Sequence, residues 1–128
     1  MRKIEFRVYS YSLQKMLSVM HILHTDRTEP EIWSGDFEGG LRLTAGDFEL
    51  MQFTGLHDQN GQEIYEGDIL RDENGDLYRV KFDGGQFQPL LRYGGTQLAI
   101  ESIVDMADYS SVIGNIYENP ELLEARDE

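Results

Sequence analysis

One short stretch of the sequence carries the acidic spacing of a calcium-binding loop. Asp72, Asn74 and Asp76 stand at alternate positions, as the first ligands of an EF-hand do. Glycine, however, occupies the fourth place of this run rather than the sixth, and the twelfth place holds Asp83 where a glutamate is needed. No helical pattern flanks the loop. The Asn-Gly pair at its centre predicts a hairpin turn instead, so we expect no metal site.

Other side chains capable of catalysis do not fall into a recognisable arrangement. The 24 acidic residues guarantee that some carboxylates lie close together, so proximity alone is weak evidence for acid–base chemistry. The sequence has no G-x-S-x-G motif, and Gly84-Gly85 lacks the lysine and helix of a phosphate loop. His21 and His24 would lie on opposite faces of a strand, which disfavours a shared metal. We therefore expect no enzyme activity, no cofactor and no small-molecule substrate.

Aromatic and basic residues are interleaved in the second half of the chain. The aromatic residues could stack on the bases of a single strand, while the basic residues contact its phosphates. The aromatic residues are Tyr78, Phe82, Phe87 and Tyr93, and the basic ones are Arg79, Lys81 and Arg92. The alternative is that the aromatic side chains form the core of a barrel. The net charge of −13 disfavours nucleic-acid binding, because phosphates are repelled at long range.

The charge is unevenly divided along the chain. Residues 1–27 hold five of the eleven basic side chains and two acids, and the rest of the chain holds six basic and 22 acidic side chains. The acidic surface favours solubility, and it could also face a basic partner or mimic the charge of DNA. Arg2, Lys3 and Arg7 could pair with an acidic neighbouring subunit. Trp33, the only tryptophan, either packs beneath a loop or anchors an interface. We therefore predict a protein partner or self-association as a homo-oligomer.

The stretch Phe53–Leu70 organises the predicted elements. Asn60-Gly61 lies between residues of strand type and predicts a type I′ turn, in which both residues have positive φ. Asp58 can bond the backbone of this turn. Gly67-Asp68 then interrupts the apolar pattern. The sequence thus predicts a hairpin, a kink and a further strand.

Alternating or short apolar runs predict the remaining strands. They cover residues 2–9, 16–22, 32–33, 41–43, 48–54, a three-stranded meander over 64–93, and a closing strand at 111–117. Apolar residues at helical spacing favour a short helix or 3₁₀ turn within 96–108. Asn119-Pro120 predicts a terminal helix over about 119–126, with the asparagine as N-cap.

We predict a single, mainly β domain in two parts. Residues 1–55 form an N-terminal β region with a hairpin, a small sheet and a long loop at 25–40, and residues 56–128 form a small barrel with the terminal helix. No apolar run approaches the length of a membrane span, and Arg2 and Lys3 precede no apolar signal segment. The absence of cysteine excludes disulfides and is consistent with a reducing cytoplasm.

Three groups of residues resemble the YopX family, small proteins of phages and prophages of mostly Gram-positive bacteria. They are Met1–Arg7; Thr54-Gly-Leu56, Asp58, Asn60-Gly61 and Glu63–Ile69; and Val112–Leu122. The resemblance implies a mainly β fold with an SH3-like barrel in the C-terminal half and a phage or prophage protein in the bacterial host cytoplasm. It implies no catalytic residues. His57 and Gln59 depart from the family, in which lysine is common at both positions.

Overall fold

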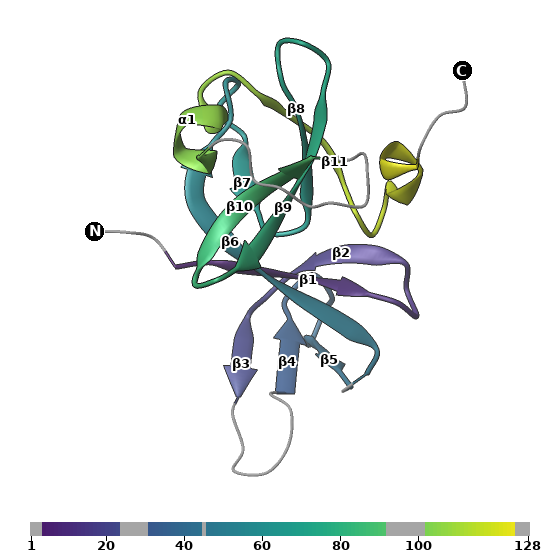
Figure 1. Ribbon diagram of the computed structural model, residues 1–128. Coiled ribbons are helices and arrows are strands. Elements are labelled where there is room, and N and C mark those ends of the chain that lie inside the picture. Colours follow the sequence, from purple (N-terminus) through teal and green to yellow (C-terminus); the bar gives the residue numbers. More distant parts are fainter. Residues whose placement is uncertain (1–3, 24–30, 45, 92–101, 125–128) are drawn as a thin grey trace. The chain divides into compact units, whose positions relative to one another are not determined.

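The computed structural model describes residues 4–23, 31–44, 46–91 and 102–124 (Figure 1). The strands are, in chain order, β1 (Phe6–Ser10), β2 (Lys15–Ser18), β3 (His21–Leu23), β4 (Glu31–Ser34), β5 (Leu41–Leu43), β6 (Phe48–His57), β7 (Glu63–Tyr65), β8 (Asp68–Arg71), β9 (Leu77–Asp83), β10 (Gln86–Leu91) and β11 (Ser111–Asn115). They form three sheets with the orders β2-β1-β6-β7, β10-β9-β8-β11 and β3-β4-β5. The mainly β fold class is confirmed.

The chain divides into two compact units, and β6 contributes to both. One unit consists of Glu5–Gln52, and the other contains Ile4 and the described residues from Phe53 onward. The first half of β6 pairs with β1, and its second half pairs with β7. The predicted division after residue 55 therefore falls inside a strand.

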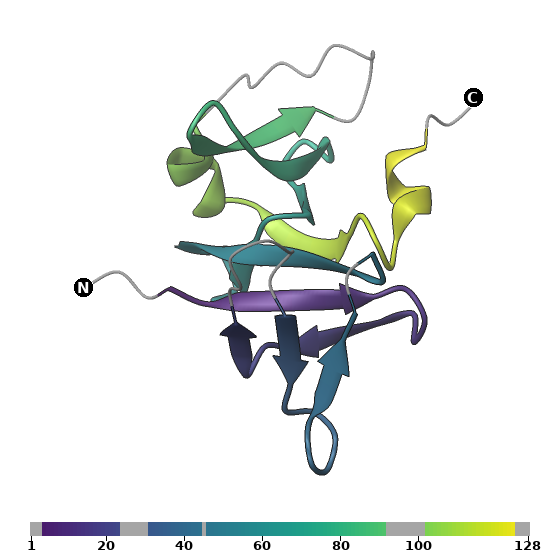
Figure 2. The same ribbon diagram turned by 90° about the horizontal axis from the view of Figure 1, so that it is seen from below.

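The N-terminal unit has a core of aliphatic side chains. Val8, Leu17, Ile32 and Leu43 are buried together. Val8 lies on the buried face of β1 because side chains alternate along a strand. β1 and β2 form the predicted hairpin (Figure 2). Ser10 lies opposite Lys15 in its register.

The apolar run over residues 16–22, predicted as one strand, is two strands, β2 and β3. The strand is interrupted because two backbone N–H groups form hydrogen bonds outside the pairing of β1 with β2. The Ser18 N–H donates to the Asp36 carboxylate at 2.9 Å, and the Met20 N–H donates to the Trp33 carbonyl at 2.7 Å. The chain therefore leaves the first sheet and enters the sheet β3-β4-β5.

The C-terminal unit buries a second core beneath the sheet β10-β9-β8-β11. Ile64, Leu70 and Val80 pack there against the helix α1 (Ile103–Ala107). α1 confirms the short helix predicted from the apolar spacing. The Ser102 hydroxyl caps its first turn by accepting from the Val104 N–H at 3.2 Å. The four-stranded sheet is compatible with an SH3-like barrel, which stays a prediction. Within the described part of the chain, no helix has the length and hydropathy of a membrane span.

Both Asn-Gly hairpins are confirmed, but the predicted type I′ turn is wrong. Gly61 and Gly75 have φ values of 83° and 86°, whereas neither preceding asparagine has positive φ. In each turn the glycine N–H donates to the carbonyl of an aspartate three residues earlier, at 3.0 Å to Asp58 and 3.1 Å to Asp72. This pattern is typical of a three-residue loop that ends in a left-handed glycine.

The C-terminal helix differs from the prediction in type and length. It is a 3₁₀ helix, η1 (Pro120–Leu123), and residues 125–126 lie outside the described residues. Asn119 does not cap it with its side chain. The Asn119 Oδ1 instead accepts from the Asn115 N–H at 3.2 Å, so the side chain turns back toward β11.

Candidate interaction surface

The residues predicted to contact nucleic acid are not gathered on one face of β9. Tyr78 is 3% exposed and belongs to the core of the C-terminal unit. Arg79 and Lys81 lie on the opposite face of the strand, because side chains alternate. Arg92 and Tyr93 lie outside the described residues. Tyr78 therefore contributes packing, as the barrel-core alternative expects.

The residues predicted for an interface differ in how the structure places them. Arg2 and Lys3 lie outside the described residues. Arg7 is half-buried in β1, where it pairs in register with β2 and β6. Trp33 is half-buried in β4. Of these four residues, Trp33 is the one around which the structure builds a surface.

The polar residues of the central motif hold the backbone. Asp58 is 6% exposed, and its Oδ1 accepts from the N–H groups of Asn60 at 2.8 Å and Gln62 at 2.9 Å. Its Oδ2 accepts from the N–H of Val112 at 2.8 Å. One carboxylate thus closes the turn and ties it to β11.

Further motif residues act in the same way. The Asp68 carboxylate, 1% exposed, accepts from the Tyr65 N–H at 2.7 Å, and the Thr54 hydroxyl donates to the Ile64 carbonyl at 2.7 Å. In the C-terminal motif, the Asn115 Oδ1 accepts from the N–H groups of Tyr117 at 3.0 Å and Glu118 at 2.8 Å. These motif residues therefore stabilise the fold.

The outer face of the sheet β3-β4-β5 carries the residues around Trp33. Ile22, Ile32 and Leu43 form the cross-strand row that faces the core. The neighbouring row on the other face is His21, Trp33 and Arg42. We define the Trp33 surface as Met20, His21, Leu23, Glu31, Trp33 and Arg42.

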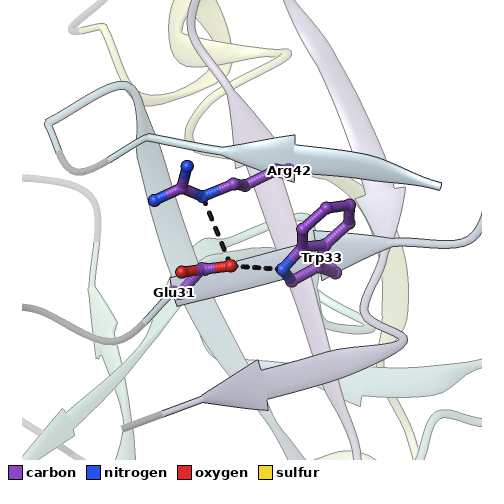
Figure 3. Close-up of polar contacts among 3 residues, drawn as sticks. All are labelled: Glu31, Trp33 and Arg42. Carbon is purple, nitrogen blue, oxygen red and sulfur yellow. Dashed lines mark hydrogen bonds and ion pairs between the residues drawn. The ribbon is translucent and has the colours of Figure 1, made fainter. Parts of the chain in front are cut away.

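The Trp33 side chain is held by a carboxylate on its own strand (Figure 3). The indole Nε1 donates to the Glu31 Oε1 at 2.6 Å, and the Arg42 Nε lies 3.3 Å from the same oxygen. The Arg42 side chain is 59% exposed and the Glu31 side chain 27%. The polar atom of the indole is thus satisfied within the sheet, and the side chain as a whole is half-buried.

Apolar side chains flank the indole. Met20 and Leu23 are each 50% exposed. A methyl group on Gly40 would lie 3.4 Å from the Met20 Cε and 3.5 Å from the Trp33 Cε3, so both side chains rest against the turn between β4 and β5. Gly40 also has a φ of 82°, which favours glycine.

Sequence reasoning selected Trp33 but missed its two charged neighbours. Glu31 could have been found, because residues two apart in a strand share a face. Arg42 comes from the next strand, and its place opposite Trp33 depends on a pairing register that the short strand β5 does not reveal.

Comparisons with known proteins agree with this fold. The family model described as YopX protein matches residues 5–124. The crystal structure of protein EF1440 from Enterococcus faecalis is similar, with 27% identity, a TM-score of 0.67, and coverage of 97% of this chain and 100% of the other. The crystal structure of protein yopX from Bacillus subtilis, 18% identical, shares the fold with a TM-score of 0.66, and the match covers 99% of this chain and 100% of that one. No curated protein matches. Since the family model spans nearly the whole chain, the chain belongs to the YopX protein family.

Proposed function

We propose that the protein is a non-enzymatic accessory protein of a phage or prophage, acting in the host cytoplasm through contact with other protein chains. The contact site is the Trp33 surface. The observation that carries this proposal is the half-buried indole that Glu31 fixes beside an exposed arginine. Tryptophan and arginine are the residues most enriched among interface hot spots.

The preorganised ring supports this assignment. Binding costs conformational entropy when a side chain must be immobilised, and the Trp33–Glu31 hydrogen bond removes part of that cost beforehand. Met20 and Leu23 add exposed apolar area that a partner would remove from water. The surface thus combines an anchor, an apolar flank and a charged rim.

The carboxylates of the family motif also fit a non-enzymatic role. Asp58 and Asp68 are buried and accept backbone N–H groups, and Asp72, which lies outside the motif, accepts two N–H groups within its own turn. A carboxylate engaged in this way stabilises a turn.

Affinity capture from lysate of phage-infected host cells tests the proposal, with three baits and a nuclease-treated duplicate of each. The baits are the wild type, Trp33→Ala and Phe82→Ala. Phe82 is a matched control because it is an aromatic residue of the other unit and 48% exposed. We expect proteins that survive nuclease to be retained by the wild type and Phe82→Ala and lost with Trp33→Ala.

Two other results would redirect the assignment. Equal recovery by all three baits would contradict a role for the Trp33 surface, and recovery abolished by nuclease would favour the nucleic-acid alternative. Light scattering over the micromolar range tests self-association. A wild-type oligomer that Trp33→Ala dissociates would make a second copy the partner.

A further inference from the structure

We propose that the Trp33 surface takes a basic polypeptide segment of another protein. A lysine or arginine of that segment lies on the Trp33 ring beside Glu31, and a neighbouring apolar side chain packs on Met20 and Leu23. This inference rests on the proposed function and names the chemistry of its partner.

The Glu31 carboxylate has room for a second cation. Its Oε1 accepts from the Trp33 indole at 2.6 Å and lies 3.3 Å from the Arg42 Nε. Within the described ranges, its Oε2 has no hydrogen-bond or ion-pair partner. A cation at this oxygen is attracted by the carboxylate charge, and a cation over the face of the adjacent indole is attracted by the ring quadrupole.

Arg42 is the internal competitor for this place. It approaches Glu31 through its Nε, and its side chain is 59% exposed. An ion pair this exposed is weak, so a cation of the partner can share or displace it at little cost. Removal of the Arg42 charge should therefore strengthen the binding of a basic segment.

The net charge of the whole chain favours a positively charged partner. The net charge is −13, which attracts basic chains and repels acidic ones, including other copies of this chain. Long-range attraction raises the association rate, and the Trp33 surface supplies the short-range contacts. A basic segment with apolar residues satisfies both requirements.

Fluorescence anisotropy of two labelled, end-blocked peptides tests the inference on the full chain. One peptide repeats Arg-Leu-Arg-Gly, and the other carries glutamate in place of every arginine. We expect the wild type to bind the basic peptide in preference to the acidic one. Emission of Trp33, the only tryptophan, should change in the same titration.

Four variants give the expected pattern for the basic peptide. Trp33→Ala should weaken binding about tenfold, as for a hot-spot residue. Glu31→Gln should weaken it about threefold, and Arg42→Gln should strengthen it about threefold, as expected for a partly exposed charge. Phe82→Ala should leave the affinity within about twofold, because it lies outside the surface.

The result that overturns the inference is equally specific. Weaker binding to Arg42→Gln, or preference for the acidic peptide, would mean that Arg42 recognises a carboxylate. Equal binding by the wild type and Trp33→Ala would mean unspecific attraction to the acidic chain. Circular dichroism checks folding, and Trp33→Phe, which keeps a ring, should bind between the wild type and Trp33→Ala.

The two proposals can fail separately. If capture depends on Trp33 but the basic peptide does not bind, the proposed function stands and the partner chemistry is wrong. If capture is independent of Trp33 and the peptide does not bind, both are wrong.

Discussion

Two turns of the C-terminal unit share the sequence Asp-x-Asn-Gly and the same local hydrogen bonds. They are residues 58–61 and 72–75. In both, the aspartate Oδ1 accepts from the N–H groups two and four residues later, at 2.8 and 2.9 Å in the first turn and at 2.9 Å twice in the second. In both, the aspartate N–H donates to the carbonyl four residues later. The same local sequence therefore builds the same turn twice.

The two turns differ in what the second carboxylate oxygen does. The Asp58 Oδ2 accepts from the Val112 N–H at 2.8 Å, a contact across 54 positions of sequence. The Asp72 Oδ2 accepts from the Tyr78 hydroxyl at 3.3 Å, six positions away. Asp58 is buried, whereas Asp72 is half-exposed. Local sequence thus determines the turn, and its place in the fold determines whether the turn also ties distant strands together.

The largest expected effect on stability comes from removing the Asp58 carboxylate, and Asp72→Ala provides the comparison. Asp58→Ala leaves three backbone N–H groups without their acceptor, and we expect it to lower the free energy of unfolding by about 3 kcal/mol. Asp72→Ala loses contacts that water can replace, and it should cost about 1 kcal/mol. Urea denaturation measures both values.

Asp58→Asn is the matched control for the long-range contact. An asparagine keeps one carbonyl acceptor for the turn but lacks the second. The free energy of unfolding of Asp58→Asn should therefore lie between that of the wild type and that of Asp58→Ala. Equal losses for Asp58→Ala and Asp72→Ala would show that the bond to Val112 adds nothing to stability.

A methyl group at the other end of β11 sharpens the comparison. A Cβ on Gly114 would lie 2.5 Å from the Asn119 Oδ1, so Gly114→Ala should cost about 2 kcal/mol through overpacking. Since Asp58 also holds β11, the losses from Asp58→Ala and Gly114→Ala should not be additive. The losses from Asp72→Ala and Gly114→Ala should be additive. Urea denaturation of the three single and two double variants tests this.

Asn119→Ala in the Gly114→Ala background provides a further check. It removes two of the three Asn119 atoms that the new methyl group would meet, the Oδ1 and the Cγ, so part of the lost stability should return. If no stability returns, the loss caused by Gly114→Ala does not come from the contact with Asn119.

The glycines of the two turns should not differ. Gly61 and Gly75 have φ values of 83° and 86°, and an added Cβ would have no atom within 4 Å at either position. Alanine at each should therefore cost about 1 kcal/mol, the penalty of a left-handed backbone alone. Thermal unfolding of Gly61→Ala and Gly75→Ala tests this. A clearly larger loss of stability for Gly61→Ala would show that the backbone conformation of the first turn, and not only the Asp58 carboxylate, is needed for its contact with β11.

Much of the fold could be predicted because it is encoded in short stretches. Alternation identified β1 and β9, and the two Asn-Gly pairs located their hairpins. The turn type was wrong because the aspartate three residues before each glycine binds the turn backbone, which leaves positive φ to the glycine alone.

Contacts between residues far apart in the sequence could not be predicted from it. Nothing in the pattern distinguishes Asp58 from Asp72, since the difference depends on Val112. The same limit applies to the Trp33 surface. The indole could be selected by its chemistry, whereas the contribution of Arg42 depends on strand register.

A third aspartate extends the comparison to the N-terminal unit and has the smallest expected effect. Asp36 accepts from both the hydroxyl and the N–H of Ser18, and it is exposed. The Ser18 hydroxyl bond, followed by the backbone N–H bond, lowers the pKa of the Asp36 carboxyl, against the smaller opposing effect of desolvation. A pKa lowered in the folded state adds stability at pH values above the ordinary pKa of an aspartate. This stability is lost as the pH falls through the lowered folded pKa.

Asp36→Asn should therefore cost no more than about 0.5 kcal/mol at neutral pH, because solvent screens an exposed charge. It should also flatten the dependence of stability on pH below about 4, the ordinary range of an aspartate. Urea denaturation of the wild type and Asp36→Asn at a series of acidic pH values measures both effects.

Asp72→Asn is the control for a half-exposed carboxylate in the other unit. If the stability of Asp36→Asn falls with acid as steeply as that of the wild type, the Ser18 contact carries none of the acid sensitivity. An exposed carboxylate that bonds two groups of one serine would then add less to stability than the buried Asp58 carboxylate, which accepts three backbone N–H groups.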